Sequence, residues 1–294
     1  MTSKKKFKDL NHYFNLRESL IRFLREDIGQ GDVTSDCIID KTTKSSAFIV
    51  CKSEAAVVAG LEEAHTIFDI CNCDSKELVK DGDSVKKGSM IMKIKGNTRA
   101  ILRAERTALN LIMRMSGIAT NTREFVNIVK TVSSDVKITG TRKTAPGLRF
   151  FDKKSIELGG GYSHRNTLDE LILIKDNHLV LTSSIQNAIS MVKLRAPKYM
   201  TIECEVGDIK SAVEAIKSGA DIIMLDNFTA KEAHKTISYL KKSGLREKVL
   251  IEISGGVNLS NIKEYASALP DMISIGSLTH SSKAIDFSME MESN

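Results

Sequence analysis

The sequence predicts an α/β protein whose larger, C-terminal part is a barrel of parallel strands. Three observations support this. After about residue 116, short apolar runs alternate with helical segments, and charged or glycine-rich residues follow each run. Before that point, helices and strands are mixed without the alternation. Alternation of this kind is typical of right-handed βα units around a parallel sheet. An open, doubly wound sheet is the alternative architecture.

Composition indicates a globular protein and excludes several classes. The 294 residues are enough for two domains, and 41% hydrophobic with 27% charged residues argue against general disorder. The formal net charge of +6 is modest and forms no basic block. With 5% aromatic residues and no Trp there are few platforms for stacked bases. We therefore expect no nucleic-acid partner; the cationic excess suits a small polyanionic substrate.

The compartment is expected to be the cytoplasm. The five cysteines are an odd number in no paired framework, which is typical of free thiols in a reducing compartment. The basic N-terminus lacks the apolar run of a signal peptide. No apolar stretch approaches the roughly 20 residues that span a bilayer, so no membrane partner is expected.

The first part of the chain contains a helical opening and several short strands. Apolar residues recur at helical spacing over 14–24, and turn formers fill 26–32. The remaining elements expected here are strands at 47–50 and 55–59, a helix at 61–70, and a hairpin turn at 80–88 before a strand at 90–94.

Residues 99–115 predict an amphipathic helix with a row of arginines. At 100° per residue its polar stripe consists of Arg99, Arg103, Arg106, Asn110 and Arg114. The opposite side consists of Ile101, Ala104, Ala108, Ile112 and Met115. By itself such a row is more often a solvated face than a binding surface.

Six apolar runs in the second part are expected to be the parallel strands. They occupy residues 136–138, 171–174, 201–204, 221–225, 249–253 and 272–275. The helices expected between them occupy 185–194, 210–218, 230–242 and 260–267. In barrel enzymes the carboxyl ends of the strands carry the site, so the residues that follow these runs are expected to converge on one mouth.

The residue types at those ends suggest an anionic ligand. Cations (Arg142, Lys143, Arg165 and Lys175) match carboxylate or phosphate. Glu205 and Asp226, on successive strands, suit ribose hydroxyls or a Mg²⁺ ion that keeps its waters. The loops at 254–256 and 276–277 suit a phosphate. The alternative, purely structural interpretations are an ion pair for Glu205 and a tight turn at 255–256.

Several motifs together resemble the quinolinate phosphoribosyltransferase family. They are EDIGQGDVT at 26–34, ERTALN at 105–110, TRKTAPGLR at 141–149, GGGYSHR at 159–165, LIKDNH at 173–178, IMLDNF at 223–228 and SGGV at 254–257. Five of them lie in order in the second part, which makes the resemblance far more specific than any single motif. It spans roughly residues 20–290.

The resemblance implies an N-terminal α/β sandwich domain (1–115), an incomplete, open α/β barrel (116–280) and a C-terminal helix (281–294) that returns to the first domain. It implies a homodimer, or a higher even oligomer, with shared active sites, and a reaction of quinolinate with phosphoribosyl pyrophosphate in NAD biosynthesis. Mg²⁺ is the expected cofactor, held by Glu205 and Asp226 directly or through water.

Site residues carry over by position in the motifs. Lys143, Lys175, Glu205 and Asp226 are the expected catalytic residues. The remaining expected substrate-binding residues are Arg106, Thr141, Arg142, His164, Arg165, Ser254, Gly255, Gly256, Gly276 and Ser277.

Two positions depart from the family pattern. Tyr162-Ser163 replaces the usual His-Asn, and Gly140 replaces an aspartate. The alternatives are therefore a related phosphoribosyltransferase of the molybdate-transport-associated branch that acts on another aromatic carboxylate, and a non-catalytic anion or nucleotide sensor. Residues 175–178 fit the quinolinate enzymes better than that branch.

Overall fold

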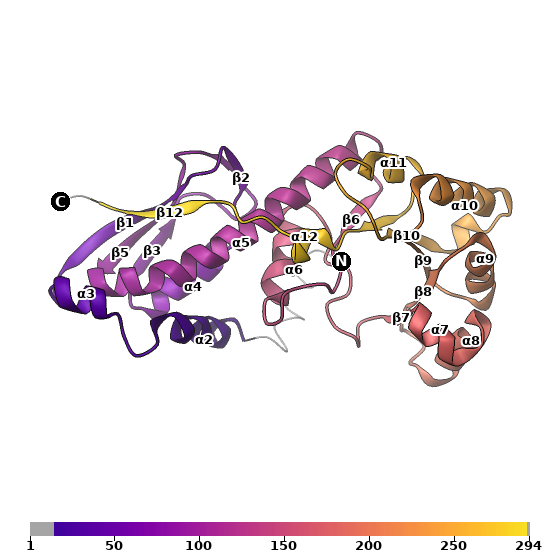
Figure 1. Ribbon diagram of the computed structural model, residues 1–294, viewed down its shortest axis with the longest axis horizontal. Coiled ribbons are helices and arrows are strands. Elements are labelled where there is room, and N and C mark those ends of the chain that lie inside the picture. The colour runs from indigo at the N-terminus through magenta and orange to yellow at the C-terminus, as the bar shows by residue number, and fades with distance from the viewer. Residues whose placement is uncertain (1–14, 293–294) are drawn as a thin grey trace. The chain divides into compact units, whose positions relative to one another are not determined.

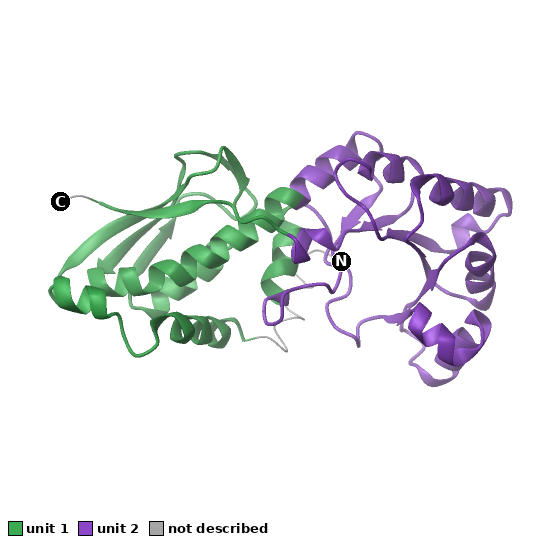
Figure 2. Cartoon of the chain, in the orientation of Figure 1, with its two compact units in different colours: residues 1–121, 150–159, 282–294 green, residues 122–149, 160–281 purple. Residues whose placement is uncertain are grey.

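A computed structural model describes residues 15–292 of the chain, which divides into two compact units (Figure 2). Unit 1 takes the chain up to Asn121, the segment Phe150–Gly159 and the chain from Ser282 onward. Unit 2 takes Thr122–Arg149 and Gly160–Ser281. The segment Phe150–Gly159 thus belongs to unit 1, whereas the sequence interpretation placed it within the barrel.

Unit 1 is built on an antiparallel sheet of four strands in the order β12-β1-β5-β3 (Figure 1). The strands are β1 (Lys44–Cys51), β3 (Asp74–Glu77), β5 (Met90–Asn97) and β12 (Phe287–Met291), and a separate pair is formed by β2 (Ala55–Val57) and β4 (Ser84–Lys86). The helices are α2 (Leu16–Ile28), α3 (Val33–Ile38) and α4 (Leu61–Ile70).

Most elements expected in this region are present. The expected strands at 47–50 and 90–94 and the helix at 61–70 are confirmed, whereas the strand expected at 55–59 ends at Val57. The expected opening helix began at residue 14, which lies outside the described residues; α2 begins at Leu16. The hairpin turn expected at 80–88 is two turns that flank the short strand β4.

The expected C-terminal helix is wrong, because residues 287–291 form strand β12. This strand pairs antiparallel with β1, and the Glu292 N–H donates to the Ser46 carbonyl at 2.8 Å beyond its end. Phe287, Met289 and Met291 alternate with polar residues, which is the period of a strand and not of a helix. The free edge of β1 supplies the unpaired backbone groups that make the extended form favourable.

Helix α5 (Thr98–Lys130) is longer than the predicted 99–115 and runs for 33 residues. The predicted apolar face, Ile101, Ala104, Ala108, Ile112 and Met115, is fully buried. The arginine stripe is largely structural. Arg99 and Arg103 pair with Asp36 at 2.9 and 2.8 Å, and Arg114 holds the buried Asp152 of α6 (Arg149–Leu158) through two hydrogen bonds.

Unit 2 contains a parallel sheet of six strands in the order β6-β11-β10-β9-β8-β7. They are β6 (Lys137–Thr139), β7 (Ile172–Ile174), β8 (Ile202–Val206), β9 (Ile222–Asp226), β10 (Leu250–Ser254) and β11 (Met272–Ser274). The last strand pairs with the first, while β6 and β7 do not pair. This is the order of a barrel that is open between β6 and β7, as the resemblance implied, and it excludes the doubly wound alternative.

Helices α7 (Asp176–Thr182), α8 (Ile185–Arg195), α9 (Ile209–Ser218), α10 (Ala230–Lys242) and α11 (Ile262–Ser267) lie outside the curved sheet (Figure 1). Unit 2 also contains the short helix α12 (Ser277–His280) and a 3₁₀ turn η1 (Arg246–Lys248).

Local capping residues set where these helices begin. The side chains of Ser184, Asp208 and Thr229 each accept a hydrogen bond from a backbone N–H in the first turn of their helix. Such caps satisfy N–H groups that have no partner within the helix. Asp208 and Thr229 come only a few residues after the ends of β8 and β9. A short loop therefore joins each of these strands to the helix that follows it. Within residues 15–292, no helix has both the length and the apolar character needed to cross a membrane.

Candidate active site

A cavity of about 400 Å³ lies at the carboxyl ends of the strands in unit 2. The residues expected from the sequence that line it are Thr141, Arg142, Lys143, His164, Arg165, Lys175, Glu205, Asp226, Ser254 and Gly255. The other lining residues are Gly140, Leu173, Met224, Asn227, Glu252 and Ser274. The convergence of the strand-end residues on one mouth is therefore confirmed for most of the set.

Four expected residues do not line this cavity. Gly256 follows Gly255 in the same loop, and Ser277 begins the short helix α12. A Cβ on Gly276 would lie 3.2 Å from Cδ of Lys143, so this glycine leaves room for that side chain. Arg106 lies on the exposed side of α5 in unit 1. Its role in binding remains an expectation.

Two acids and two lysines face one another across the mouth. Glu205, near the end of β8, lies 4.0 Å from Nζ of Lys175, measured from Oε1. Burial raises the pKa of Glu205, the Lys175 ammonium opposes that rise, and the Asp226 carboxylate adds to it. Burial also raises the pKa of Asp226, which the Lys143 ammonium opposes. These acids are close enough to act on the same ligand.

The loop after β10 meets the loop after β9 through a glycine. Gly255 has φ of +93°, a region that favours glycine, and a Cβ there would overlap the side chain of Asn227. The Asn227 backbone N–H donates to the Ser254 carbonyl at 2.8 Å, and its side-chain amide donates to Asp226 at 2.7 Å. The glycine therefore lets the two loops close against each other beside Asp226.

Hydrogen bonds hold the loop that carries Lys143. The Thr279 hydroxyl donates to the Lys143 carbonyl at 2.8 Å, and the Lys143 N–H donates to the Thr141 hydroxyl at 3.1 Å. The backbone of Lys143 is thus anchored from two sides, while its side chain is exposed at the mouth.

Arg142 and Arg165 form a cationic wall. The Arg165 guanidinium donates to the Leu171 carbonyl at 3.3 Å. Burial and the positive charge of Arg142 lower the pKa of Arg165. The buried Nε of Arg142 has no hydrogen-bond partner among the described residues. An orphaned donor on a guanidinium beside a second guanidinium is the arrangement expected of a site that binds an anion.

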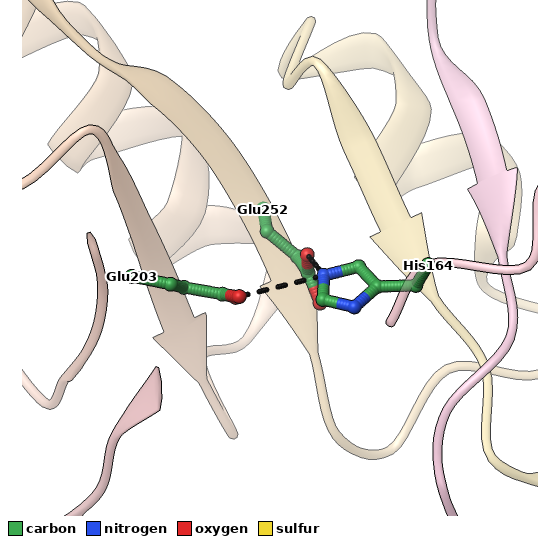
Figure 3. A group of neighbouring side chains, drawn as sticks. All are labelled: His164, Glu203 and Glu252. Atoms are coloured by element: carbon green, nitrogen blue, oxygen red, sulfur yellow. Dashed lines mark hydrogen bonds and ion pairs between the residues drawn. The ribbon is translucent and has the colours of Figure 1, made fainter. Parts of the chain in front are cut away.

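His164 is held by two glutamates that sequence reasoning missed (Figure 3). Its Nε2 lies 2.9 Å from Oε2 of Glu252 and 3.4 Å from Oε2 of Glu203. Burial by itself would lower the pKa of His164, but the two carboxylates raise it to about 9. Both glutamates interrupt otherwise apolar strand runs, IECEV and LIEIS, and that interruption is the signal that could have found them.

Two groups of side chains offer ligand atoms that a metal ion could use. The carboxylates of Glu205 and Asp226 are the hard oxygen donors that suit Mg²⁺, which keeps several waters. His164, Glu203 and Glu252 also have ligand atoms within 4.8 Å of one another. Because Nδ1 accepts from the Arg165 backbone N–H, Nε2 carries the ring proton here and donates it to Glu252.

Comparison with known sequence families gives matches to both parts of the chain. Residues 32–116 match the family described as quinolinate phosphoribosyl transferase, N-terminal domain. Residues 118–290 match quinolinate phosphoribosyl transferase, C-terminal domain.

Individual relatives match over nearly their whole length. The chain is 41% identical over 261 residues to a probable nicotinate-nucleotide pyrophosphorylase (carboxylating) of Archaeoglobus fulgidus, covering 89% of this chain and 98% of that protein. It is 39% identical to the protein of the same description from Bacillus subtilis, covering 96% and 95%. Among solved structures, NadC from Streptococcus pyogenes is 34% identical with a TM-score of 0.88, covering 94% of this chain and 96% of that chain.

Proposed function

Since this chain belongs to the quinolinate phosphoribosyltransferase family, we propose that its strand-end cavity joins quinolinate to phosphoribosyl pyrophosphate, giving nicotinate mononucleotide, pyrophosphate and carbon dioxide. The enzyme is a carboxylating nicotinate-nucleotide pyrophosphorylase, a pentosyltransferase of NAD biosynthesis. One observation carries the assignment to this cavity: Lys143, Lys175, Glu205 and Asp226 come from separate βα connections and line the same space.

The first step is a substitution at the sugar. The pyridine nitrogen attacks ribose C1 while the bond from C1 to pyrophosphate breaks, and positive charge develops on the sugar. The carboxylates of Glu205 and Asp226 stabilise that charge. Lys143 and Lys175 neutralise the leaving pyrophosphate. Such a mechanism relies on positioning and electrostatics and needs no covalent intermediate with the protein.

Mg²⁺ is proposed as the cofactor, because phosphoribosyl pyrophosphate is a polyanion and the two acids supply oxygen ligands. When bound, it would add positive charge beside the pyrophosphate. Lys175 lies 4.0 Å from Glu205, so the same acid also orients a lysine toward the leaving group.

The second step removes the carboxylate at C2 of the ring. Once its nitrogen is bonded to ribose, the pyridinium ring accepts the electron pair left when carbon dioxide departs, and a proton then takes its place at C2. Arg142 and Arg165 are proposed to hold the carboxylates and so fix the orientation of the ring.

The test is incubation of the protein with quinolinate, phosphoribosyl pyrophosphate and Mg²⁺, with the products identified by mass. We expect nicotinate mononucleotide and release of carbon dioxide in equal amounts. Nicotinate in place of quinolinate is the control, since it cannot release carbon dioxide. Product formation from nicotinate but not from quinolinate would overturn the assignment, and ligand binding without pyrophosphate release would indicate a sensor.

The active form is proposed to be a homodimer with shared sites, as the family resemblance implies. Arg106 supports this because it is exposed and, among residues 15–292, forms no ion pair, unlike Arg99, Arg103 and Arg114. In a shared site it would bind the substrate in the cavity of the other subunit. The cysteines are free thiols, which supports a reducing, cytoplasmic location.

Mixing two inactive variants tests the shared site. Arg106→Ala and Lys175→Ala proteins are unfolded together, or co-expressed, so that subunits exchange. Each mixed dimer then has one intact site, so we expect about a quarter of the wild-type activity to return. The control is each variant carried through the same procedure alone. No recovery in verified mixed dimers would contradict a composite site.

A further inference from the structure

Two glutamates lie inside the barrel, where branched apolar side chains usually fill the layers. Glu203 is 0% exposed and Glu252 is 1% exposed. Glu203 precedes Glu205 by two residues on β8, and Glu252 precedes Ser254 by two on β10, so alternation of the strands turns all four toward the barrel interior. Buried carboxylates destabilise a fold unless they are paired. Their presence here calls for a function.

Both carboxylates point at the same ring nitrogen, from strands β8 and β10, which are separated in the sheet by β9 alone (Figure 3). Nε2 of His164 is hydrogen-bonded to Oε2 of Glu252 and lies at ion-pair distance from Oε2 of Glu203, and the ring is only 10% exposed. His164 has φ of +53°, a strained conformation for a residue with a Cβ. The two glutamates thus fix a strained residue whose ring lines the cavity beside Arg165.

The remaining ring nitrogen is the one that an anion can use. Nδ1 accepts a hydrogen bond from the Arg165 backbone N–H at 2.7 Å. A proton on Nδ1 ends that hydrogen bond and leaves two N–H groups, one on Nδ1 and one on Arg165, as donors. The two carboxylates beside Nε2 favour this charged form, and they raise the pKa of His164 to about 9.

We infer that Glu203 and Glu252 are positioning residues that hold His164 in the cavity wall as a fixed cation for a carboxylate of the aromatic substrate. This rests on the proposed function, which it deepens by separating the two substrates. The phosphoribosyl pyrophosphate groups are assigned to Lys143, Lys175 and the loop at Gly255. The buried glutamates are assigned to the aromatic dicarboxylate alone.

The test replaces each glutamate by glutamine, which keeps the shape and a hydrogen-bond acceptor but removes the charge. For Glu252→Gln and Glu203→Gln we expect the KM for quinolinate to rise at least about tenfold, because a charge-assisted contact is lost. The KM for phosphoribosyl pyrophosphate is expected to stay within about twofold of wild type. A purely structural role would not separate the two KM values.

Glu63→Gln is the matched control. Glu63 is also fully buried, pairs with Lys154 at 2.8 Å, and belongs to unit 1, so it does not line the cavity of unit 2. We expect this variant to lose thermal stability and to keep the wild-type KM for quinolinate. If one glutamine variant of the cluster fails to fold, the other one decides the question.

A second measurement needs no substrate. In protein labelled with ¹⁵N-histidine, the ring signals of His164, assigned with His164→Gln, are expected to show both nitrogens protonated at neutral pH in the wild type. They are expected to show one unprotonated nitrogen in Glu252→Gln. A ring that stays charged in both glutamine variants, or KM values that rise together for both substrates, overturns the inference. Failure of the wild-type enzyme to release carbon dioxide refutes the proposed function instead, and the ring signals still decide the role of the glutamates.

Discussion

Replacement of Asp226 by asparagine is expected to lower kcat about a hundredfold, the effect typical of removing one well-placed charge from a transition state. Asp226 ends β9 at the mouth of the cavity, with Glu205 on the neighbouring strand. Asparagine keeps the shape of the side chain but cannot stabilise positive charge on the ribose. Lys143→Ala is expected to lower kcat by a similar factor, because the leaving pyrophosphate loses its neutralising ammonium.

Loss of activity in Asp226→Asn is not expected to come from unfolding. Burial raises the pKa of Asp226 above its usual value, so the ionised carboxylate destabilises the fold as the pH rises through that pKa. The neutral amide removes this penalty, and the thermal midpoint is expected to stay or rise. Steady-state kinetics and thermal melting of the same preparation measure both effects.

Asp135→Asn is the matched control for this variant. Asp135 is exposed and precedes β6 at the amino end of the strand, away from the mouth. Its replacement is expected to leave kcat within about twofold of wild type. Wild-type turnover in both Asp226→Asn and Lys143→Ala would remove these residues from the mechanism.

Replacement of Gly117 by alanine is expected to destabilise unit 1 by about 3 kcal/mol, through overpacking against a backbone that has little room to move. Gly117 lies in α5, and a Cβ there would overlap the carbonyl oxygen of Lys283 and lie 3.3 Å from Cα of Ala284. The Ile285 N–H donates to the Met113 carbonyl at 3.0 Å, so the chain after Ser282 is bonded closely along this helix.

The direction of that effect is diagnostic. Alanine favours a helix over glycine by about 1 kcal/mol, so a variant without the clash would be more stable than the wild type. Urea unfolding measures the loss, and hydrogen exchange of β12 locates it, since the strand must shift to make room. Gly207→Ala is the control, because a Cβ there meets no atom within 4 Å. Wild-type stability and unchanged exchange in Gly117→Ala would contradict the close approach.

Both the strands of unit 2 and the chemistry at their ends could be predicted from the sequence. An apolar run of a parallel strand is buried on both faces, so it stands out from its polar surroundings whatever its partners are. The residues directly after such runs, among them Lys175 and Asp226, must then lie at one edge of the sheet. The cavity confirms this for the polar ends of β6 to β10.

Several features could not be predicted because they depend on partners distant in sequence. Helical spacing places Arg114 in an arginine stripe that is expected to face solvent, but in the structure Arg114 pairs with the buried Asp152. The segment that contains Asp152 leaves the barrel and joins unit 1. The family resemblance implied a C-terminal helix, whereas the apolar alternation over 287–291 indicates a strand. The sequence of this segment does not show that its partner is the edge of β1.

The amino-acid sequence by itself determined the family, the strand–helix order and the set of charged strand ends, since all of these follow from local periodicity and from motifs. Only the tertiary structure decided which charges meet. Glu203 and Glu252 are separated by 49 positions in the chain, and they act on one imidazole because the curvature of the sheet turns β8 and β10 toward the same interior. Coulomb energy depends on distance in space, and that distance is set by the closure of the sheet and not by the order of residues.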